Sequence, residues 1–295
     1  VALWVTIVYF PVAHWVFAFG NKVGDTITGA GFLAARGVQD FAGGTAVHIN
    51  AGAAGLAMAM ILGRRVGWRR DSMRPHSLPL VLIGAGLLWF GWFGFNAGSS
   101  LGANGVAALA LLNTQVATAA AALGWLLIEK IRDGHPTSLG VASGAVSGLV
   151  AITPACAFVA PWAAVVIGLL AGIFCALAVG IKYRLNFDDS LDVVGVHLVG
   201  GLWGSLSIGF FGSSAVNSIS LDGVFYGGGT ELLGKQALGS FFVLAYSFIV
   251  TLIIGFIIDK SMGLRIKEEA EISGIDYDQH AETGYELTSN SRGGF

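Results

Sequence analysis

The chain has 295 residues, of which 55% are hydrophobic and 12% are charged, with 44 glycines and a mean hydropathy of +0.73. A typical water-soluble domain has about 25% charged residues and about 7% glycine. This chain has about half that share of charged residues and about twice that share of glycine. This composition argues against soluble enzymes, nucleic-acid-binding proteins and disordered chains, and it predicts a polytopic membrane protein. The net charge of −2 indicates no polyanionic partner. Cys156 and Cys175 lie in apolar runs, so we expect neither a disulfide framework nor a CxxC metal site.

Apolar segments long enough to cross a bilayer, which takes roughly 20 residues for a helix, recur along the chain. They cover approximately residues 1–19, 41–62, 78–98, 103–128, 138–160, 162–181, 193–211 and 237–258. None of the 16 basic and 18 acidic residues lies inside them. Strands of a membrane barrel would instead alternate polar and apolar residues. The predicted fold class is therefore all-α, a polytopic membrane protein, and small residues spaced four apart, such as Gly144 and Gly148, predict close helix packing.

The Lys and Arg residues predict the orientation, because cytoplasmic loops carry an excess of them. Most of the 16 fall on one side of the eight spans, and the three on the other side are Lys22, Arg36 and Lys235. The first side is predicted to be cytoplasmic and to hold both ends of the chain. We expect residues 1–260 to form the transmembrane domain and residues 261–295 a cytoplasmic tail.

Two histidines inside the spans share a local pattern. His48 lies in DFAGGTAVHINAGAAG and His197 in DSLDVVGVHLVGGLWG, and each follows an aspartate and precedes two glycines at the same spacing. An ionisable side chain inside a membrane is costly and marks a functional site by default. Because the two spans run in opposite directions, the pattern is typical of an inverted repeat, whose site lies at the repeat interface near the bilayer midplane. We therefore expect the two histidines to be neighbours across one pathway.

Simpler interpretations of these polar residues stay open. A lone histidine is often a core residue bonded to a backbone carbonyl, and His14, which has no matching partner, is expected to be structural. Asp40 and Asp189 each precede a helix, where a carboxylate caps free N–H groups and meets the positive helix dipole. Counted along their spans, His48 and His197 lie at different depths in the membrane. They therefore meet only if the seventh span begins deep in a cytoplasmic vestibule. Paired membrane histidines would also suit the axial ligands of haem.

Four long motifs follow one another along the chain: DFAGGTAVHINAG, FGWFGFNAGSSLGANG, LVAITPACAFV and DDSLDVVGVHLVGGLWG. With GIDYDQHAETGYE near the C-terminus, they closely resemble the ammonium transporter (Amt/Rh) family over about residues 1–285. The resemblance implies eleven helices in an inverted five-plus-five repeat with a last helix, assembled as a homotrimer with one narrow hydrophobic pore per protomer. The eight spans match the fourth to eleventh helices. Most of the first repeat is therefore expected to be missing, and this chain alone is not expected to conduct ammonium.

The resemblance also implies roles for individual residues. His48 and His197 match the paired pore histidines, and Phe95 matches the inner phenylalanine of the stacked gate. Ser99 matches the serine that accepts a hydrogen bond from ammonium in the outer vestibule. Asp40 matches an aspartate that shapes this vestibule without contacting the ion.

Other expected site residues are less direct. Phe17 stands where the family usually has a vestibule tryptophan, and its rivals are Trp15, Phe19 and Phe32. Asp192 and Thr153 are expected to have structural roles near the site. Trp92 joins Phe95 and Ser99 at i, i+3 and i+7, where aromatic faces attract a cation and a hydroxyl oxygen accepts one of ammonium's donors. The alternative for these aromatics is an interfacial belt.

Taken together, we expect an ammonium transporter or channel in the plasma membrane, not an enzyme, with no cofactor and no metal. NH4+ would bind outside and lose a proton, and ammonia would cross the apolar pore past the twin histidines, which can donate and accept a proton. An ammonium sensor or an Rh-type gas channel would share these motifs and remains an alternative. Expected partners are ammonium, two further copies of the chain, membrane lipid and a PII-type protein at the cytoplasmic face, but no nucleic acid.

The orientation predicts an accessibility difference. In intact cells, a cysteine introduced as Arg69→Cys should resist a membrane-impermeant thiol reagent added from outside, whereas Arg36→Cys should react. Mass shift of the purified protein measures both. Rapid labelling at position 69 with none at position 36 would reverse the topology.

Overall fold

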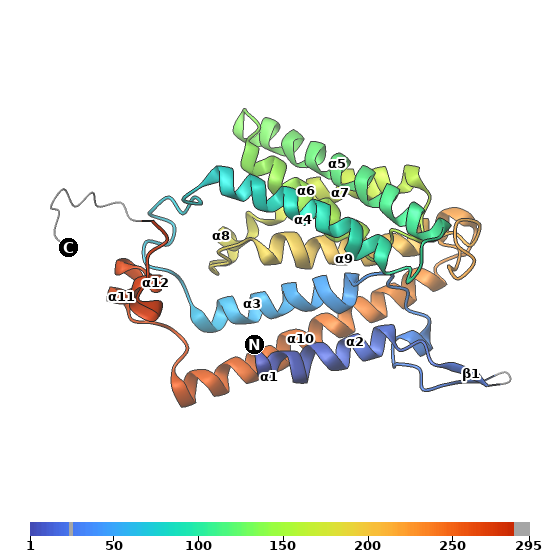
Figure 1. Cartoon of the computed structure of the whole chain (residues 1–295), viewed down its shortest axis with the longest axis horizontal. Helices are drawn as coiled ribbons and strands as arrows, with labels where there is room; N and C mark the ends of the chain where they lie inside the picture. The colour runs from blue at the N-terminus through green and yellow to red at the C-terminus, as the bar shows by residue number, and fades with distance from the viewer. Residues whose placement is uncertain (24–25, 286–295) are drawn as a thin grey trace, which may run out of the picture.

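The computed structural model describes residues 1–23 and 26–285 as a bundle of helices that lie roughly along one long axis (Figure 1). The helices are α1 (Ala2–Trp4), α2 (Phe10–Phe17), α3 (Asn50–Leu62), α4 (Leu78–Gly98), α5 (Gly105–Asp133), α6 (Ser138–Ile152), α7 (Pro161–Ala178), α8 (Ile181–Leu185), α9 (Val199–Phe211), α10 (Glu231–Met262), α11 (Glu268–Ser273) and α12 (Ile275–His280). Three π-helical segments, Val5–Tyr9, Gly44–Ile49 and Val194–Leu198, run directly into α2, α3 and α9. Strands β1 (Asn21–Val23) and β2 (Thr26–Thr28) pair as an antiparallel hairpin at one end.

The predicted helical class is confirmed. Among the described residues, six helices are long and apolar enough to cross a membrane: Gly44–Leu62, Leu78–Gly98, Gly105–Asp133, Pro161–Leu185, Val194–Phe211 and Glu231–Met262. Two further apolar helices, Ala2–Phe17 and Ser138–Ile152, are shorter than 18 residues. Helix α10 begins before the predicted start of its span at residue 237, because Glu231 and Lys235 add a polar first turn closed by an ion pair at 2.6 Å.

The predicted span at residues 138–160 is wrong at its end. Helix α6 stops at Ile152, because Pro154 has no N–H to donate and its ring clashes with the preceding helical turn. The chain then forms turns whose carbonyls need partners inside the bundle. The Nδ2 group of Asn113 supplies them, donating to the carbonyls of Cys156 and Val159 at 2.7 and 2.8 Å.

Glycines bring α6 and α7 against the backbone of α5. A Cβ atom at Gly168 would lie 2.1 Å from the carbonyl oxygen of Ala117, and one at Gly172 would lie 2.1 Å from that of Ala121. From the other side, a Cβ at Gly148 would lie 2.7 Å from the Ala117 carbonyl. The predicted packing of small residues is therefore confirmed, and α5 is clamped between two helices.

The inverted pair of motifs forms a second close crossing, between α3 and α9. A Cβ at Gly52 would lie 2.4 Å from the backbone nitrogen of Leu198. Its counterpart Gly201 lies against the other motif, where a Cβ would meet the Cβ of His48 at 3.0 Å and the backbone nitrogen of Ile49 at 3.1 Å. Each motif's glycine thus contacts the histidine segment of the other motif, as an inverted repeat requires.

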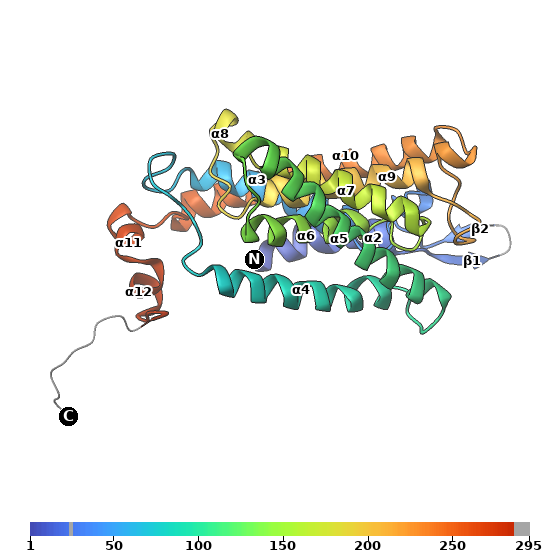
Figure 2. The same ribbon diagram turned by 90° about the horizontal axis from the view of Figure 1, so that it is seen from above.

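Loop residues 63–77 and the tail helices lie at the end opposite the hairpin (Figures 1 and 2). The Glu271 carboxylate of α11 accepts from the backbone nitrogen of Val66 at 2.7 Å and from the Arg265 guanidinium at 3.0 Å. The two predicted sides of the eight spans therefore lie at opposite ends of the bundle. Which of these ends faces the cytoplasm stays a prediction. Figure 2 shows α4 lying apart along one side of the bundle. Apolar side chains of this helix, such as Leu87 and Phe90, are exposed.

The α3–α9 crossing generates a stability prediction. Gly52→Ala should lower the free energy of unfolding by about 1–3 kcal/mol, because the added methyl group meets backbone that cannot move aside. Gly234→Ala in α10 is the matched control: its Cβ meets nothing within 4 Å, and alanine favours the helix. Thermal unfolding in detergent measures both variants. Equal midpoints for the two would contradict the close approach.

Candidate functional site

The two predicted histidines meet in the centre of the α3–α9 crossing. The Nδ1 atoms of His48 and His197 lie 3.2 Å apart, and the ring centroids are 5.3 Å apart at an interplanar angle of 40°. One ring must therefore donate and the other accept. His48 is only 2% exposed, and its Nε2 atom is buried with no hydrogen-bond partner in the part of the chain that the structure describes.

Asp40 organises the start of the first motif. Its Oδ1 atom accepts from the backbone nitrogens of Gly43 and Gly44, both at 2.7 Å. Its Oδ2 atom accepts from the backbone nitrogens of Thr45 and Ala46 at 2.8 and 3.2 Å, and from the Thr45 hydroxyl. The predicted capping role is confirmed, since the carboxylate satisfies four free N–H groups at the positive end of the helix.

Asp189 caps the second motif in the same way. Its Oδ1 and Oδ2 atoms accept from the backbone nitrogens of Val193 and Val194 at 3.0 and 2.7 Å. The capping interpretation is confirmed here as well. The Lys182 ammonium group also fixes the backbone of this residue, because it donates a hydrogen bond to the Asp189 carbonyl at 3.0 Å.

Both histidines lie in π-helical segments, a feature absent from the sequence-based expectations. The backbone nitrogen of His48 donates to the Gly43 carbonyl, five residues back, at 3.0 Å. His197 lies in the matching segment Val194–Leu198. Single π-helical turns inside α-helices are often found at functional sites, because the extra residue changes where side chains point.

Trp92 orients the ring of His48. The indole stacks on the imidazole with a centroid separation of 5.4 Å and an interplanar angle of 17°. Its Nε1–H donates to the hydroxyl of Thr153 at 2.8 Å, and that hydroxyl donates to the Leu149 carbonyl at 2.7 Å. Thr153, expected to be structural, thus acts on the histidine pair through Trp92.

The remaining vestibule candidates are only partly brought together. Phe95 makes an edge-on contact with Trp92, with ring centroids 5.7 Å apart, and Ser99 follows at the end of α4, its hydroxyl donating to the Phe95 carbonyl at 2.8 Å. Phe17 packs against a different apolar cluster, one that includes Val12 and Val16. Its place in the outer vestibule stays a prediction.

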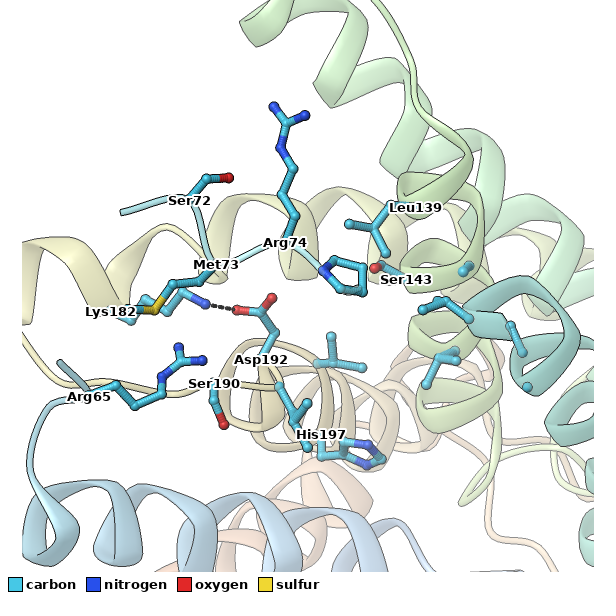
Figure 3. Close-up of a pocket in the computed structure, with 18 of the residues that line it drawn as sticks. Arg65, Ser72, Met73, Arg74, Leu139, Ser143, Lys182, Ser190, Asp192 and His197 are labelled. Carbon is cyan, nitrogen blue, oxygen red and sulfur yellow. Dashed lines mark hydrogen bonds and ion pairs between the residues drawn. The ribbon is translucent and has the colours of Figure 1, made fainter. Parts of the chain in front are cut away.

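An open cavity of about 1070 Å³ leads to His197 from the end that carries the tail (Figure 3). Its charged lining includes Arg65, Arg69, Arg74, Lys182, Asp71 and Asp192. An open cavity therefore lies at the start of the predicted seventh span, where Ser190 and Asp192 line it. Whether it is a cytoplasmic vestibule stays a prediction.

Two carboxylates near this cavity have opposite pKa shifts. Burial raises the pKa of Asp192, although its ion pair with Lys182, at 2.6 Å, acts in the other direction. Burial also acts to raise the pKa of Asp188, but hydrogen bonds from Arg65 at 2.7 and 2.8 Å outweigh it and lower the pKa below its usual value.

Gln236 is a positioning residue that the sequence reasoning missed. It is fully buried in α10, and its side-chain amide pairs with the backbone of Gln39 through two bonds of 2.7 Å. Its Nε2 atom also donates to the Ser205 carbonyl at 3.0 Å. The segment that delivers Asp40 is thereby tied to the last long helix. The sequence signal that could have identified this residue was a glutamine directly before the predicted apolar span at residues 237–258.

The contact between the histidines does not fit axial ligation of haem through their Nδ1 atoms. Metal–imidazole bonds are about 2.0–2.1 Å long, so two axial imidazoles, which lie trans to each other, would hold their nitrogens about 4 Å apart. The observed separation is 3.2 Å. The haem interpretation therefore finds no support in this geometry.

These features define a helical membrane protein in which two inverted motifs hold a buried histidine pair at their interface and a cavity opens to one side. Residues 1–285 match the family described as Ammonium Transporter Family. The chain belongs to this family.

Named relatives agree. An ammonium transporter of Mycobacterium bovis is 56% identical over 97% of this chain, and Ammonium transporter Amt1 of Archaeoglobus fulgidus is 46% identical over 96% of it. Crystal structures of Candida albicans Mep2 include one with a TM-score of 0.81 at 36% identity, covering 90% of this chain and 59% of that chain. The chain spans 60% of the length of the Mycobacterium bovis protein and 69% of Amt1.

The Trp92–Thr153 bond generates a test of how the histidine ring is held. Thr153→Val keeps the side-chain shape but leaves the buried indole N–H without an acceptor, so the free energy of unfolding should fall by about 1–3 kcal/mol. Thr153→Ser keeps the hydroxyl and should lose less. Denaturant titration followed by tryptophan fluorescence compares the two. A valine variant as stable as the serine variant would contradict the role of the bond.

Proposed function

We propose that the complete protein containing this chain moves ammonium across the plasma membrane. NH4+ binds at the outer end, loses a proton, and passes the apolar section as ammonia, while His48 and His197 relay the proton. The observation that carries the proposal is their buried contact at 3.2 Å, with the Nε2 atom of His48 unpartnered among the described residues. The names of the relatives, which are ammonium transporters, support the substrate.

Desolvation favours this mechanism over passage of the intact ion. Moving an unpaired monovalent cation into an apolar interior costs many kcal/mol. Ammonium avoids most of this cost by leaving its proton behind, an option that potassium lacks. Imidazole suits the task, because a neutral ring accepts a proton at one nitrogen while donating from the other.

We assign the outer capture of the ion to one face at the end of α4. Trp92 and Phe95 would face the cation with their rings, a contact worth about 0.5–2 kcal/mol each, and Ser99 would accept a hydrogen bond from it. Phe17 would complete the vestibule. Asp40 would shape it through the backbone that it caps, without contacting the ion.

The proposed partners act at other surfaces. Two further copies of the chain would form a homotrimer, and lipid would cover the remaining apolar faces. A PII-type protein would dock at the cytoplasmic end. Docking of the tail on the 63–77 loop, through Glu271 and the backbone of Val66, supports a regulatory surface there.

An ammonium sensor is the second candidate, because the chain is similar to a solved structure named Sensor Amt Protein. That match has a TM-score of 0.84 at 32% identity, and it covers 94% of this chain and 68% of that chain. A sensor would bind ammonium with little current. Solid-supported-membrane recordings from liposomes after an ammonium jump separate the two, and they also reject a purely gas-conducting pore if charge moves.

The histidine pair generates the main functional prediction. In the complete protein, His48→Ala and His197→Ala should each abolish proton-coupled ammonium current, because either change breaks the relay and leaves a buried polar group without its partner. Potassium leak should rise, since the widened polar gap holds water.

His14→Ala is the matched control, because His14 is exposed on α2, and it should retain most of the current. All three variants are recorded in liposomes of one composition, with protein incorporation measured. Wild-type coupled current in both pair variants would show that the histidines serve packing alone.

A further inference from the structure

We propose that Arg65 and Asp188 are positioning residues for the histidine pair, because their ion pair fixes the angle at which the two histidine-bearing helices cross. The inference rests on the proposed function and adds a second fixed point, far from the crossing itself. It follows from where the two residues lie in the chain. Arg65 comes three residues after the end of α3 at Leu62, and Asp188 comes directly before the aspartate that caps the His197 segment.

The ion pair holds the Asp188 carboxylate in one orientation. The Arg65 guanidinium donates to both oxygens, from Nη2 to Oδ1 at 2.7 Å and from Nε to Oδ2 at 2.8 Å. The backbone nitrogen of Arg65 also donates to Oδ2, at 2.8 Å. The Asp188 side chain is 1% exposed, whereas that of Arg65 is 39% exposed. A bidentate pair with a third bond restricts both distance and direction, which a single contact would not.

Asp188 is connected to the histidine through the cap that follows it. Asp189 accepts hydrogen bonds from the backbone nitrogens of Val193 and Val194, at the start of the π-helical segment that contains His197. Because the two aspartates are adjacent in the chain, fixing the Asp188 carboxylate also fixes where this cap lies relative to the end of α3. The ion pair therefore ties the helix of one histidine to the start of the helix of the other.

Distance from the crossing gives this tie its effect. At the α3–α9 crossing, Gly52 and Gly201 let the two segments approach closely, which fixes a distance but leaves the angle between the helices adjustable. His48 lies roughly 6 Å from Gly52 along the helix on one side, and the end of α3 lies roughly 15 Å from it on the other. A shift of about 1 Å at the far end therefore moves the ring by about 0.4 Å.

The histidine contact is sensitive to a movement of this size. The two Nδ1 atoms are 3.2 Å apart, at the upper end of the usual range for a hydrogen bond, and a separation of about 3.6 Å no longer forms one. The arginine next to Arg65 provides a contrast. Arg64 is exposed, and within the described residues its side chain bonds only to the Asn186 carbonyl, at 3.2 Å.

The first test measures current. In the complete protein, Arg65→Gln should lower ammonium-evoked current by roughly fivefold to tenfold, since a misplacement of about 1 Å can cost on the order of a hundredfold. Arg65→Lys keeps the charge but loses the bidentate geometry, so it should lose less. Arg64→Gln is the matched control and should keep the current of the parent. Incorporation into liposomes is measured for every variant.

A double-mutant cycle then shows whether Arg65 acts through the histidines. Potassium leak should rise in Arg65→Gln. The double variant with His48→Ala should leak no more than His48→Ala alone, because the contact that Arg65 positions is already absent. Additive leaks would mean that Arg65 acts elsewhere, and they would overturn the inference.

A spectroscopic readout separates this inference from the proposed function. Solid-state nitrogen NMR of the imidazole rings in liposomes reports the shared Nδ1 hydrogen bond without any transport. Its signal, identified as the one that His197→Ala removes, should weaken in Arg65→Gln and persist in Arg64→Gln. An unchanged signal in Arg65→Gln overturns the positioning role whatever the currents show. Parent-like current in both histidine variants, with the signal weakened in Arg65→Gln, overturns the relay and supports the positioning role.

A second variant covers the case in which Arg65→Gln does not insert into the membrane. Arg65→Lys then decides, because it keeps the charge beside Asp188 and changes only the geometry of the pair. Its signal must be weaker than that of Arg64→Gln. A signal as strong as that of the control overturns the inference.

Discussion

The structure depends on one contact, the hydrogen bond between two imidazole rings inside an apolar bundle. A polar ring buried without a partner is costly, so each histidine stabilises the burial of the other. The contact requires α3 and α9 to cross at backbone distance, which Gly52 and Gly201 allow from opposite sides. It also requires both helices to begin at fixed positions, which Asp40 and Asp189 ensure as caps.

The starts of the two helices that carry the histidines are built differently although the motifs match. At one end, Asp40 satisfies four backbone nitrogens within a buried loop that Gln236 ties to the last long helix. At the other end, Asp189 satisfies two, and an ion pair between Lys182 and Asp192 faces an open cavity. The first arrangement favours rigidity, whereas the second exposes titratable groups to water.

Sequence reasoning predicted the helical class, the repeat and the histidine contact, because apolar length and the Asp–His–Gly spacing are local patterns. It missed what depends on three-dimensional packing. The stacking of Trp92 on His48 joins residues from separate helices, and no residue spacing in the sequence predicts it. The early end of α6 was readable from Pro154, but the uninterrupted apolar run beyond it suggested a longer span. Phe17 stayed ambiguous among several nearby aromatic residues, because its partner surface is not encoded locally.

The π-helical turns have a consequence for how the motifs tolerate length changes. Each turn holds one residue more than an α-helical turn. It therefore sets the rotation of the regular helix that follows relative to the capped start of the motif. Deleting one residue between Gly44 and His48 would restore regular winding with nearly the same phase beyond the turn. Winding all of the present residues as a regular α-helix would instead rotate the helix by up to about 100° relative to its cap. The imidazole would then face a different neighbour while every side chain kept its identity. The site is therefore encoded in the number of residues between cap and ring as much as in their chemistry.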